Sequence, residues 1–332
     1  MKRTARLAIL CLLICAFLAQ TLVLSACSEE KKEIVIYTSA EDFRIAYMQE
    51  RMAEKFPDYK VVFEYKSSGD HAAYLKSAGT DAECDISHDI EYSYAAELSS
   101  AGVFADISSM VSFDVYTADA ILNDYVAPEL RNGGAIILNM DVITEKGLDI
   151  PTSYRDLLDP QYKDLISMPN PNASGTGYMF YLNLVNAWGE EHAMQYFNDL
   201  SENVLAFTSS GSGPVNALVG KEVAIGFGMT AQATLKITEG ENLRIVFFEE
   251  GSPFSMYGQA IIAGKESDPA VVEVFDFLAN ELTEEMCESF YPEKIFKDKD
   301  FAVENFPVGI VYGDMRDNTP TRKANLLTKW TH

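Results

Sequence analysis

The chain has 332 residues and an ordinary globular composition, with 48% hydrophobic and 23% charged residues. This length is enough for a large core and predicts about two domains, and the composition argues against a disordered chain. The formal net charge of −24 argues against nucleic acid and anionic membrane surfaces as partners. An anionic ligand would therefore have to be held by local N–H groups, hydroxyls and dipoles.

The N-terminus carries three basic residues ahead of an apolar run over residues 7–19. This pattern is typical of a secretory signal, and a membrane-spanning anchor is the alternative. Residues 24–27, Leu-Ser-Ala-Cys, resemble the bacterial lipobox, whose cysteine is lipidated and becomes the mature N-terminus. We therefore predict a signal peptide over residues 1–26, lipidation of Cys27 and a tether over residues 27–32. The mature protein would then be extracytoplasmic and anchored to the cell membrane by acyl chains.

Two cysteines, Cys84 and Cys287, remain after the signal peptide and the lipidated residue. We expect two buried thiols that lie far apart, with a disulfide as the alternative. The histidines are scattered and form no HExxH-like pair, and no nucleophile elbow is present. The sequence therefore predicts no metal site, no cofactor and no catalytic residue, so we do not expect an enzyme.

The most informative stretch is residues 170–178, Asn-Pro-Asn-Ala-Ser-Gly-Thr-Gly-Tyr. It lies between a short apolar run over residues 165–168 and an apolar-rich segment over residues 178–188, so it predicts a strand, a tight turn and a helix start. Such a turn directs free N–H groups, two hydroxyls and the positive end of a helix dipole toward one point, which suits an anion. Residues 208–214, Thr-Ser-Ser-Gly-Ser-Gly-Pro, repeat this chemistry.

The first half of the chain predicts a βαβ unit with strands over residues 33–37 and 61–65 and a helix over residues 45–56. Polar turns follow both strands. The second turn, residues 67–70, opens another helix over residues 72–78, and in open parallel sheets the ligand crevice lies at such strand ends. Further on, we expect a short strand over residues 84–87 and then a loop over residues 88–92.

A turn cluster over residues 128–134 and a buried strand over residues 135–138 predict a crossing into a second lobe. Among the later elements, we expect a capped helix over residues 151–158 and further helices over residues 190–200, 269–281 and 284–290. Strands are expected over residues 223–227 and 243–248, with a return strand over residues 259–263. A loop at a helix start is expected over residues 228–232. We assign residues 33–130 and 259–310 to lobe 1 and residues 131–258 to lobe 2. We do not assign residues 311–332 to either lobe.

Several short motifs, in this order and spacing, resemble the bacterial extracellular solute-binding proteins of ABC importers, in the branch for ferric iron, phosphonates and sugar phosphates. The motifs are residues 34–37 with the Thr38-Ser39 turn, Ser68-Gly69, Cys84-Asp85-Ile86, residues 151–157, Ser174-Gly175-Thr176-Gly177, residues 220–226 and residues 257–261. The resemblance implies an α/β, two-lobed periplasmic-binding-protein-like fold of type II with crossing strands and a ligand cleft between the lobes. It also implies a monomer that delivers one small solute to an ABC permease and its ATPase.

The family's iron ligands are only partly matched. Iron-binding members have two adjacent tyrosines after the strand that corresponds to residues 223–227, where this chain has Met229 and Thr230. The family's histidine falls near Glu41, and its acidic ligand corresponds to Asp89 or Glu91. Ferric iron is therefore the alternative ligand, and an organic phosphate, such as a sugar phosphate, or a phosphonate is the prediction.

The predicted ligand-binding residues fall into three groups. Hydroxyl donors are Ser39, Ser68, Ser174, Thr176 and Thr230; N–H donors are Gly69, Gly175 and Gly177; and the organic part meets Tyr92 and Tyr257, with Asp89, Glu91 or Glu249 as acceptors. For each hydroxyl, the structural alternative is a helix N-cap, and for the tyrosines it is core packing. A sensory or hydrolase role without transport is the functional alternative.

Overall fold

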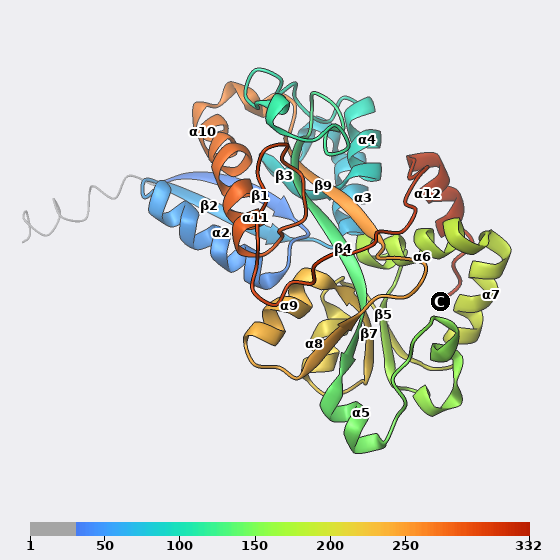
Figure 1. Cartoon of the computed structure of the whole chain (residues 1–332). Helices are drawn as coiled ribbons and strands as arrows, with labels where there is room; N and C mark the ends of the chain where they lie inside the picture. The colour runs from blue at the N-terminus through green and yellow to red at the C-terminus, as the bar shows by residue number, and fades with distance from the viewer. Residues whose placement is uncertain (1–30) are drawn as a thin grey trace, which may run out of the picture.

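The computed structural model describes residues 31–332, which form two lobes joined by long strands (Figure 1). The predicted signal peptide and the Cys27 lipidation site lie outside the described residues. Within residues 31–332, no helix is both long and apolar enough to span a membrane.

Lobe 1 contains three parallel strands, β1 (Lys32–Thr38), β2 (Tyr59–Tyr65) and β3 (Ile86–Glu91), in the order β2-β1-β3. Its helices are α2 (Asp42–Lys55), α3 (Ser68–Ala78), α4 (Tyr92–Ser100), α10 (Pro269–Phe277) and α11 (Thr283–Ser289). Buried Ile34 and Ile36 of β1 pack with Met48 of α2 and Phe275 of α10 in one core. The predicted βαβ unit is confirmed, because parallel strands and an amphipathic crossover helix are what this residue pattern favours.

Lobe 2 is built in the same way around β5 (Ile166–Pro169), β6 (Val204–Thr208) and β7 (Ile225–Met229), which are parallel. Its other elements are α5 (Met140–Lys146), α6 (Gly175–Trp188), α7 (Glu190–Leu200), α8 (Gly213–Val219), α9 (Thr230–Thr238) and β8 (Leu243–Val246). Residues 175–185 of α6 are all buried. A helix that is apolar on every side must lie inside the domain, and α6 begins at the predicted turn.

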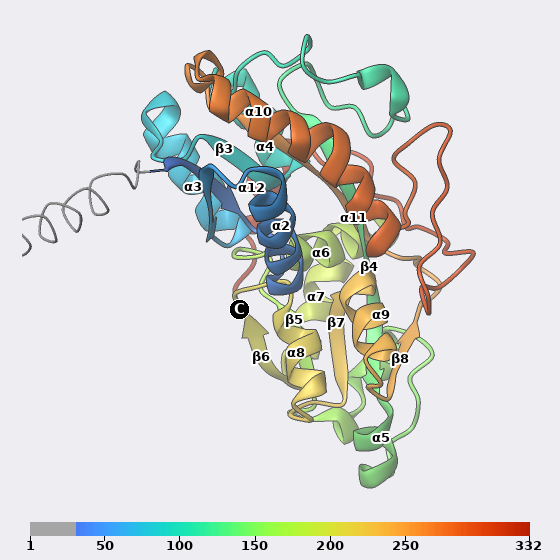
Figure 2. The ribbon, with the colours of Figure 1, turned by 90° about the vertical axis from the view of Figure 1, so that its left-hand side faces the viewer.

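Two strands connect the lobes, β4 (Ala127–Asn139) and β9 (Phe254–Ile261) (Figures 1 and 2). The first part of β4 pairs with β9 as far as Gly133, and from Gly134 onward β4 pairs with β7 of lobe 2. In turn, β9 pairs with β3 of lobe 1. The predicted lobe boundaries at residues 130 and 258 fall inside these two strands and stay predictions.

Two predicted loops are strands. Residues 128–134 were expected to form a turn cluster but lie inside β4, where a register shift between Pro128 and Leu130 accommodates the proline. Residues 88–91 were expected in a loop but belong to β3, which has an irregularity between Ser87 and Ile90 and a positive φ of 55° at Asp89. Pairing with neighbouring strands therefore overrides the local turn preference in both places.

Three predicted helices also differ. Residues 151–158 contain only a single 3₁₀ segment, η3 (Arg155–Leu158), rather than a capped α-helix. The two helices expected over residues 269–281 and 284–290 are continuous, because a π-helical turn, η6 (Leu278–Leu282), joins α10 to α11. Cys84 and Cys287 are both buried and unpaired, as predicted.

The C-terminal segment contacts both lobes. Its helix α12 (Pro320–Leu327) lies at the side where the lobes meet (Figure 1). The Nζ of Lys323 lies 2.6 Å from the Glu91 carboxylate at the end of β3, and Trp330 packs against Tyr181 and Phe197 in the core of lobe 2. This segment therefore packs on lobe 2 while it forms a buried ion pair with lobe 1.

Candidate functional site

A cleft of about 710 Å³ opens where the two lobes meet, and side chains from both lobes line it. Its lining comes from the turns after β1, β2, β5 and β6, from Asp89 near the end of β3, and from Met229 at the end of β7. In lobe 1, β1 pairs in parallel with β2 and β3, and in lobe 2, β5 pairs in parallel with β6 and β7. The carboxyl ends of parallel strands thus form the cleft, as expected for an open α/β sheet.

Half of the predicted binding residues line this cleft. They are Ser39, Ser68, Ser174, Thr176 and Tyr257. Gly69, Glu91, Gly175, Gly177 and Thr230 are not among its lining residues. The binding role of each of the ten residues stays a prediction, but the structure brings together the serines and threonines of three separate turns.

The lobe 2 wall of the cleft carries hydroxyls and no charge. It consists of Ala173, Ser174, Thr176, Ser209, Ser210, Gly211, Ser212, Asn216 and Met229. Ser174 is the N-cap of α6, and its hydroxyl oxygen accepts a hydrogen bond from the Gly177 N–H. A Cβ at Gly211 would collide with the Thr176 hydroxyl, so only glycine lets the loop after β6 pack directly on the first turn of α6.

The lobe 1 wall is acidic. Glu41, Asp42, Asp70 and Asp89 line it, and Lys66 is the basic side chain of the lining. The Lys66 ammonium lies over the ring of Tyr37, 4.1 Å from its centroid. The two walls therefore differ in kind, because one offers carboxylate acceptors and the other offers hydroxyls and the N-terminus of a 14-residue helix.

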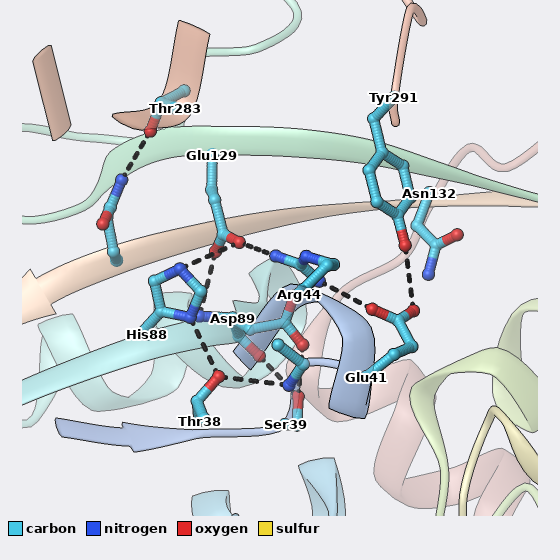
Figure 3. A network of polar contacts seen from close by, with 12 residues as sticks. Thr38, Ser39, Glu41, Arg44, His88, Asp89, Glu129, Asn132, Thr283 and Tyr291 are labelled. Atoms are coloured by element: carbon cyan, nitrogen blue, oxygen red, sulfur yellow. Dashed lines mark hydrogen bonds and ion pairs between the residues drawn. The ribbon is translucent and has the colours of Figure 1, made fainter. Parts of the chain in front are cut away.

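Behind the acidic wall, three carboxylates surround the buried guanidinium of Arg44 (Figure 3). Nη1 of Arg44 donates to Asp89 Oδ1 at 2.7 Å and to Glu41 Oε2 at 3.1 Å, and Nη2 donates to Glu129. The Tyr291 hydroxyl donates to Glu41 Oε1 at 2.9 Å. This network fixes the positions of Glu41 and Asp89, the two members whose side chains reach the cleft.

The same guanidinium affects its neighbours differently. Burial raises the pKa of Glu41 above its ordinary value, and Arg44 offsets this only in part. Burial also acts to raise the pKa of Asp89, but Arg44, His88 and the Ser39 hydroxyl outweigh it, so this pKa lies below its ordinary value. The ionised form of Asp89 is therefore favoured at this wall.

Several predicted donors have other partners. The Ser39 hydroxyl donates to Asp89 Oδ2 at 2.7 Å, and the Ser68 hydroxyl donates to Ser39 at 3.1 Å. The Ser39 hydroxyl thus has a carboxylate acceptor and the Ser68 hydroxyl has the Ser39 oxygen as its acceptor, and donation by either hydroxyl to an anionic ligand stays a prediction. Gly177 likewise donates its N–H to its own N-cap residue, Ser174.

Glu91 was expected to accept hydrogen bonds from the ligand, but it is buried at the end of β3 and is not among the residues that line the cleft. Its carboxylate accepts hydrogen bonds from Lys323, Ser93 and Asn318. Burial acts to raise the pKa of Glu91, but Lys323 and Ser93 outweigh it and lower the pKa below its ordinary value. The side chain therefore stabilises the junction between β3 and the C-terminal segment. The hydroxyl of Tyr92, the other predicted tyrosine, donates to the Ala120 carbonyl.

Sequence reasoning missed Arg44, Glu129 and Asn132. Arg44 could have been found, because it lies four and eight residues before Met48 and Met52 on the buried stripe of α2. A charged residue on an apolar stripe requires buried partners. Glu129 and Asn132 lie in the stretch taken as a turn, so no signal pointed to them.

Among residues 31–332, no group of three or more His, Cys, Asp or Glu side chains has the arrangement of a metal site. Met229 ends β7 and Thr230 begins α9, and neither side chain is an anionic oxygen donor of the kind that hard cations prefer. Burial keeps the pKa of the Tyr257 phenol well above its ordinary value.

Comparison with solved structures supports the fold. A periplasmic binding protein, AfuA from Actinobacillus pleuropneumoniae with fructose-6-phosphate bound, is 20% identical with a TM-score of 0.78, over 91% of this chain and 98% of that one. The periplasmic binding protein P5PA is 17% identical with a TM-score of 0.77, over 90% and 98%. The apo ferric ion-binding protein A of Pasteurella haemolytica is 16% identical with a TM-score of 0.69, over 90% and 96%. At these identities the likeness confirms the predicted two-lobed α/β fold and nothing finer.

Sequence comparison identifies the family. A family described as bacterial extracellular solute-binding protein matches residues 96–306, more than half of the chain. An uncharacterized protein from Haemophilus influenzae is 26% identical over 260 residues, which cover 75% of this chain and 73% of that protein. Proteins of this family bind solutes outside the cytoplasm and are not enzymes. The chain belongs to the bacterial extracellular solute-binding protein family and is the solute-binding component of an ABC transporter.

Proposed function

We propose that the cleft captures an organic phosphate, such as a sugar phosphate, with a phosphonate as the nearest variant. The observation that carries this proposal is the difference between the two walls. The lobe 2 wall combines uncharged hydroxyls with the start of α6, and the lobe 1 wall carries four carboxylates. A ligand with an oxyanion at one end and hydroxyls at the other fits both walls at once.

The oxyanion end lies against lobe 2. The first N–H groups of an α-helix have no acceptor within the helix, and the helix dipole adds positive potential there. Ser174 and Thr176 lie at this position on α6, and Ser209 to Ser212 face them from the next turn. Because no carboxylate lines this wall, an anion here avoids direct repulsion.

The hydroxylated end lies against lobe 1. Asp89 and Asp42 offer acceptors to ligand hydroxyls, and the half-exposed ring of Tyr65 offers an apolar face. A bare dianion would be repelled at this wall, so inorganic phosphate fits the cleft less well than a phosphate ester. The bound fructose-6-phosphate in the related Actinobacillus protein is consistent with this class of ligand.

Delivery completes the proposed function. We infer that acyl chains on Cys27 hold the protein at the cell membrane and that the loaded cleft passes its solute to an ABC permease driven by a cytoplasmic ATPase. Binding without a salt bridge fits this task, because aligned amides and hydroxyls release an oxyanion when the lobes separate.

A thermal-shift titration of residues 28–332 tests the ligand class. Fructose 6-phosphate, 2-aminoethylphosphonate, inorganic phosphate and ferric citrate serve as probes. The organic phosphate should raise Tm most, because a ligand at a hundred times its Kd adds about 2.7 kcal/mol to the free energy of unfolding. The double variant Ser174→Ala/Thr176→Val should lose most of this shift while its own Tm stays close to that of the wild type.

Ferric iron is the competing outcome. If ferric citrate alone raised Tm and produced a visible charge-transfer band, the organic phosphate proposal would be wrong. Cleavage of the phosphate ester by the purified protein would instead favour a hydrolase.

A further inference from the structure

Asn132 has an unsatisfied acceptor at the cleft. The residue is 4% exposed, and it lies on β4 among the residues that line the cleft. Its Nδ2 donates to the Met229 sulfur at 3.1 Å, while its Oδ1 has no hydrogen-bond partner within the described chain. A buried amide oxygen without a donor is destabilising, so its retention requires an explanation.

The position of Asn132 is also unusual. On β4 it is paired with Ser255 of β9, and two residues later Gly134 is paired with Met229 of β7. The strand therefore changes partner between Gly133 and Gly134, one residue beyond Asn132. Figure 3 shows its amide beside Tyr291, on the side of the Arg44 network where Glu41 lies. The amide thus forms part of the cleft floor, between the acidic wall and the hydroxyl wall.

We propose that Asn132 determines ligand specificity by accepting a hydrogen bond from a hydroxyl in the middle of the ligand. This inference rests on the proposed function, since it assigns a third contact to the same ligand. The free Oδ1 requires a donor, and a phosphate oxygen cannot supply one, because both groups are acceptors. A hydroxyl between the phosphoryl group and the far end of the ligand supplies this donor.

The contact gives selectivity as well as affinity. A site with a buried acceptor binds poorly to analogues that lack the matching hydroxyl, because the acceptor then stays unpaired. Inorganic phosphate and unsubstituted alkyl phosphates could satisfy the lobe 2 wall but not this oxygen. Asn132 therefore discriminates against small oxyanions that the first turn of α6 would otherwise hold.

Titration calorimetry on residues 28–332 tests the proposal with two probes, fructose 6-phosphate and hexyl phosphate. Hexyl phosphate has six carbons and a phosphoryl group but no hydroxyl. In Asn132→Leu, which has nearly the same size and no acceptor, the affinity for fructose 6-phosphate should fall about tenfold or more. The affinity for hexyl phosphate should change less than about twofold.

Two further variants serve as controls. Ser255→Ala removes a buried hydroxyl from the paired residue on β9, which does not line the cleft, and should leave both affinities within about twofold. Asn132→Asp keeps an acceptor at the same position. It should preserve the preference for fructose 6-phosphate over hexyl phosphate, even though its negative charge lowers the affinity for both probes. It also tests the proposal if the leucine variant fails to fold.

The outcomes separate the two proposals. If the wild type bound fructose 6-phosphate but Asn132→Leu weakened both probes equally or neither, the role of Asn132 would be refuted and the proposed function would stand. Loss of the preference in Asn132→Asp would refute it as well. If the wild type bound neither phosphate, the proposed function would fail and this inference with it.

Discussion

At the scale of single residues, Arg44 illustrates how a buried charge is tolerated. Its side chain is almost fully buried, and three carboxylates and the Tyr291 ring surround it. Each charge that is moved from water into the protein interior costs several kcal/mol unless buried partners compensate. Removing the arginine would leave Glu41, Asp89 and Glu129 buried next to one another without their shared cation.

We therefore expect Arg44→Met to lower the free energy of unfolding by about 3–5 kcal/mol, measured by urea denaturation at pH 7. The matched control is Arg51→Met on the same helix, whose guanidinium is partly exposed and pairs with Glu54 and Glu285 at the surface. Surface ion pairs contribute little, so the control should change stability much less. Equal losses in the two variants would contradict a special role for the buried network.

At the scale of elements, the start of α6 contains two glycines with different constraints. A Cβ at Gly175 would come 2.5 Å from the Tyr257 hydroxyl and 3.5 Å from the Ser68 hydroxyl, both at the junction with lobe 1. A Cβ at Gly177 would instead meet backbone of its own lobe, including the Asn170 carbonyl carbon at 2.8 Å. The first glycine permits approach between the lobes, and the second permits the turn itself.

Gly175→Ala should therefore weaken ligand affinity about tenfold, with little loss of stability, because the new methyl group collides with Tyr257 across the lobe junction. Gly177→Ala should mainly lower Tm, since backbone atoms cannot yield as a side chain can. Calorimetry and thermal melts of the two variants check this contrast. The double variant Gly175→Ala/Tyr257→Phe removes the colliding hydroxyl and should recover affinity, and failure to recover it would contradict the steric explanation.

At the scale of the whole molecule, stability should depend on pH through Glu293, which is buried against the crossing strand. A Cβ at Gly133 would collide with its Oε1, to which the Tyr312 hydroxyl donates at 3.1 Å, while Oε2 has no partner within residues 31–332. Burial raises the pKa of Glu293 to about 8, and Tyr312 and Arg131 offset this only in part. The folded state therefore favours the protonated, neutral form of Glu293.

Because this carboxyl has a higher pKa in the folded than in the unfolded state, its contribution is fully present below about pH 4.5 and is lost as pH rises to about 8. The free energy of unfolding of the wild type should thus decline over this range, by at most about 4 kcal/mol, relative to Glu293→Gln. Urea denaturation of both proteins at several pH values measures the difference. Parallel pH profiles would show that Glu293 does not titrate in this range.

Local chemistry was predictable where a few consecutive residues decide the structure. The turn over residues 170–178 was found from its hydroxyls and glycines, and helix α7 begins and ends where its amphipathic pattern indicated, at Glu190 and Leu200. The prediction failed where distant strands decide. Residues 128–134 have the composition of a turn, but pairing with β9 and β7 makes them a strand.

The sequence by itself determined the acidic character and the hydroxyl-rich turns at strand ends, because these depend on composition and on short-range periodicity, and its resemblance to a known family implied the two-lobed class. Only the tertiary structure decided which polar groups share the cleft and which are occupied elsewhere. Arg44 meets Asp89 and Glu129 across 45 and 85 residues of chain, and Glu91 meets Lys323 across 232. Contacts over such separations depend on how the strands pair, and no local pattern encodes them.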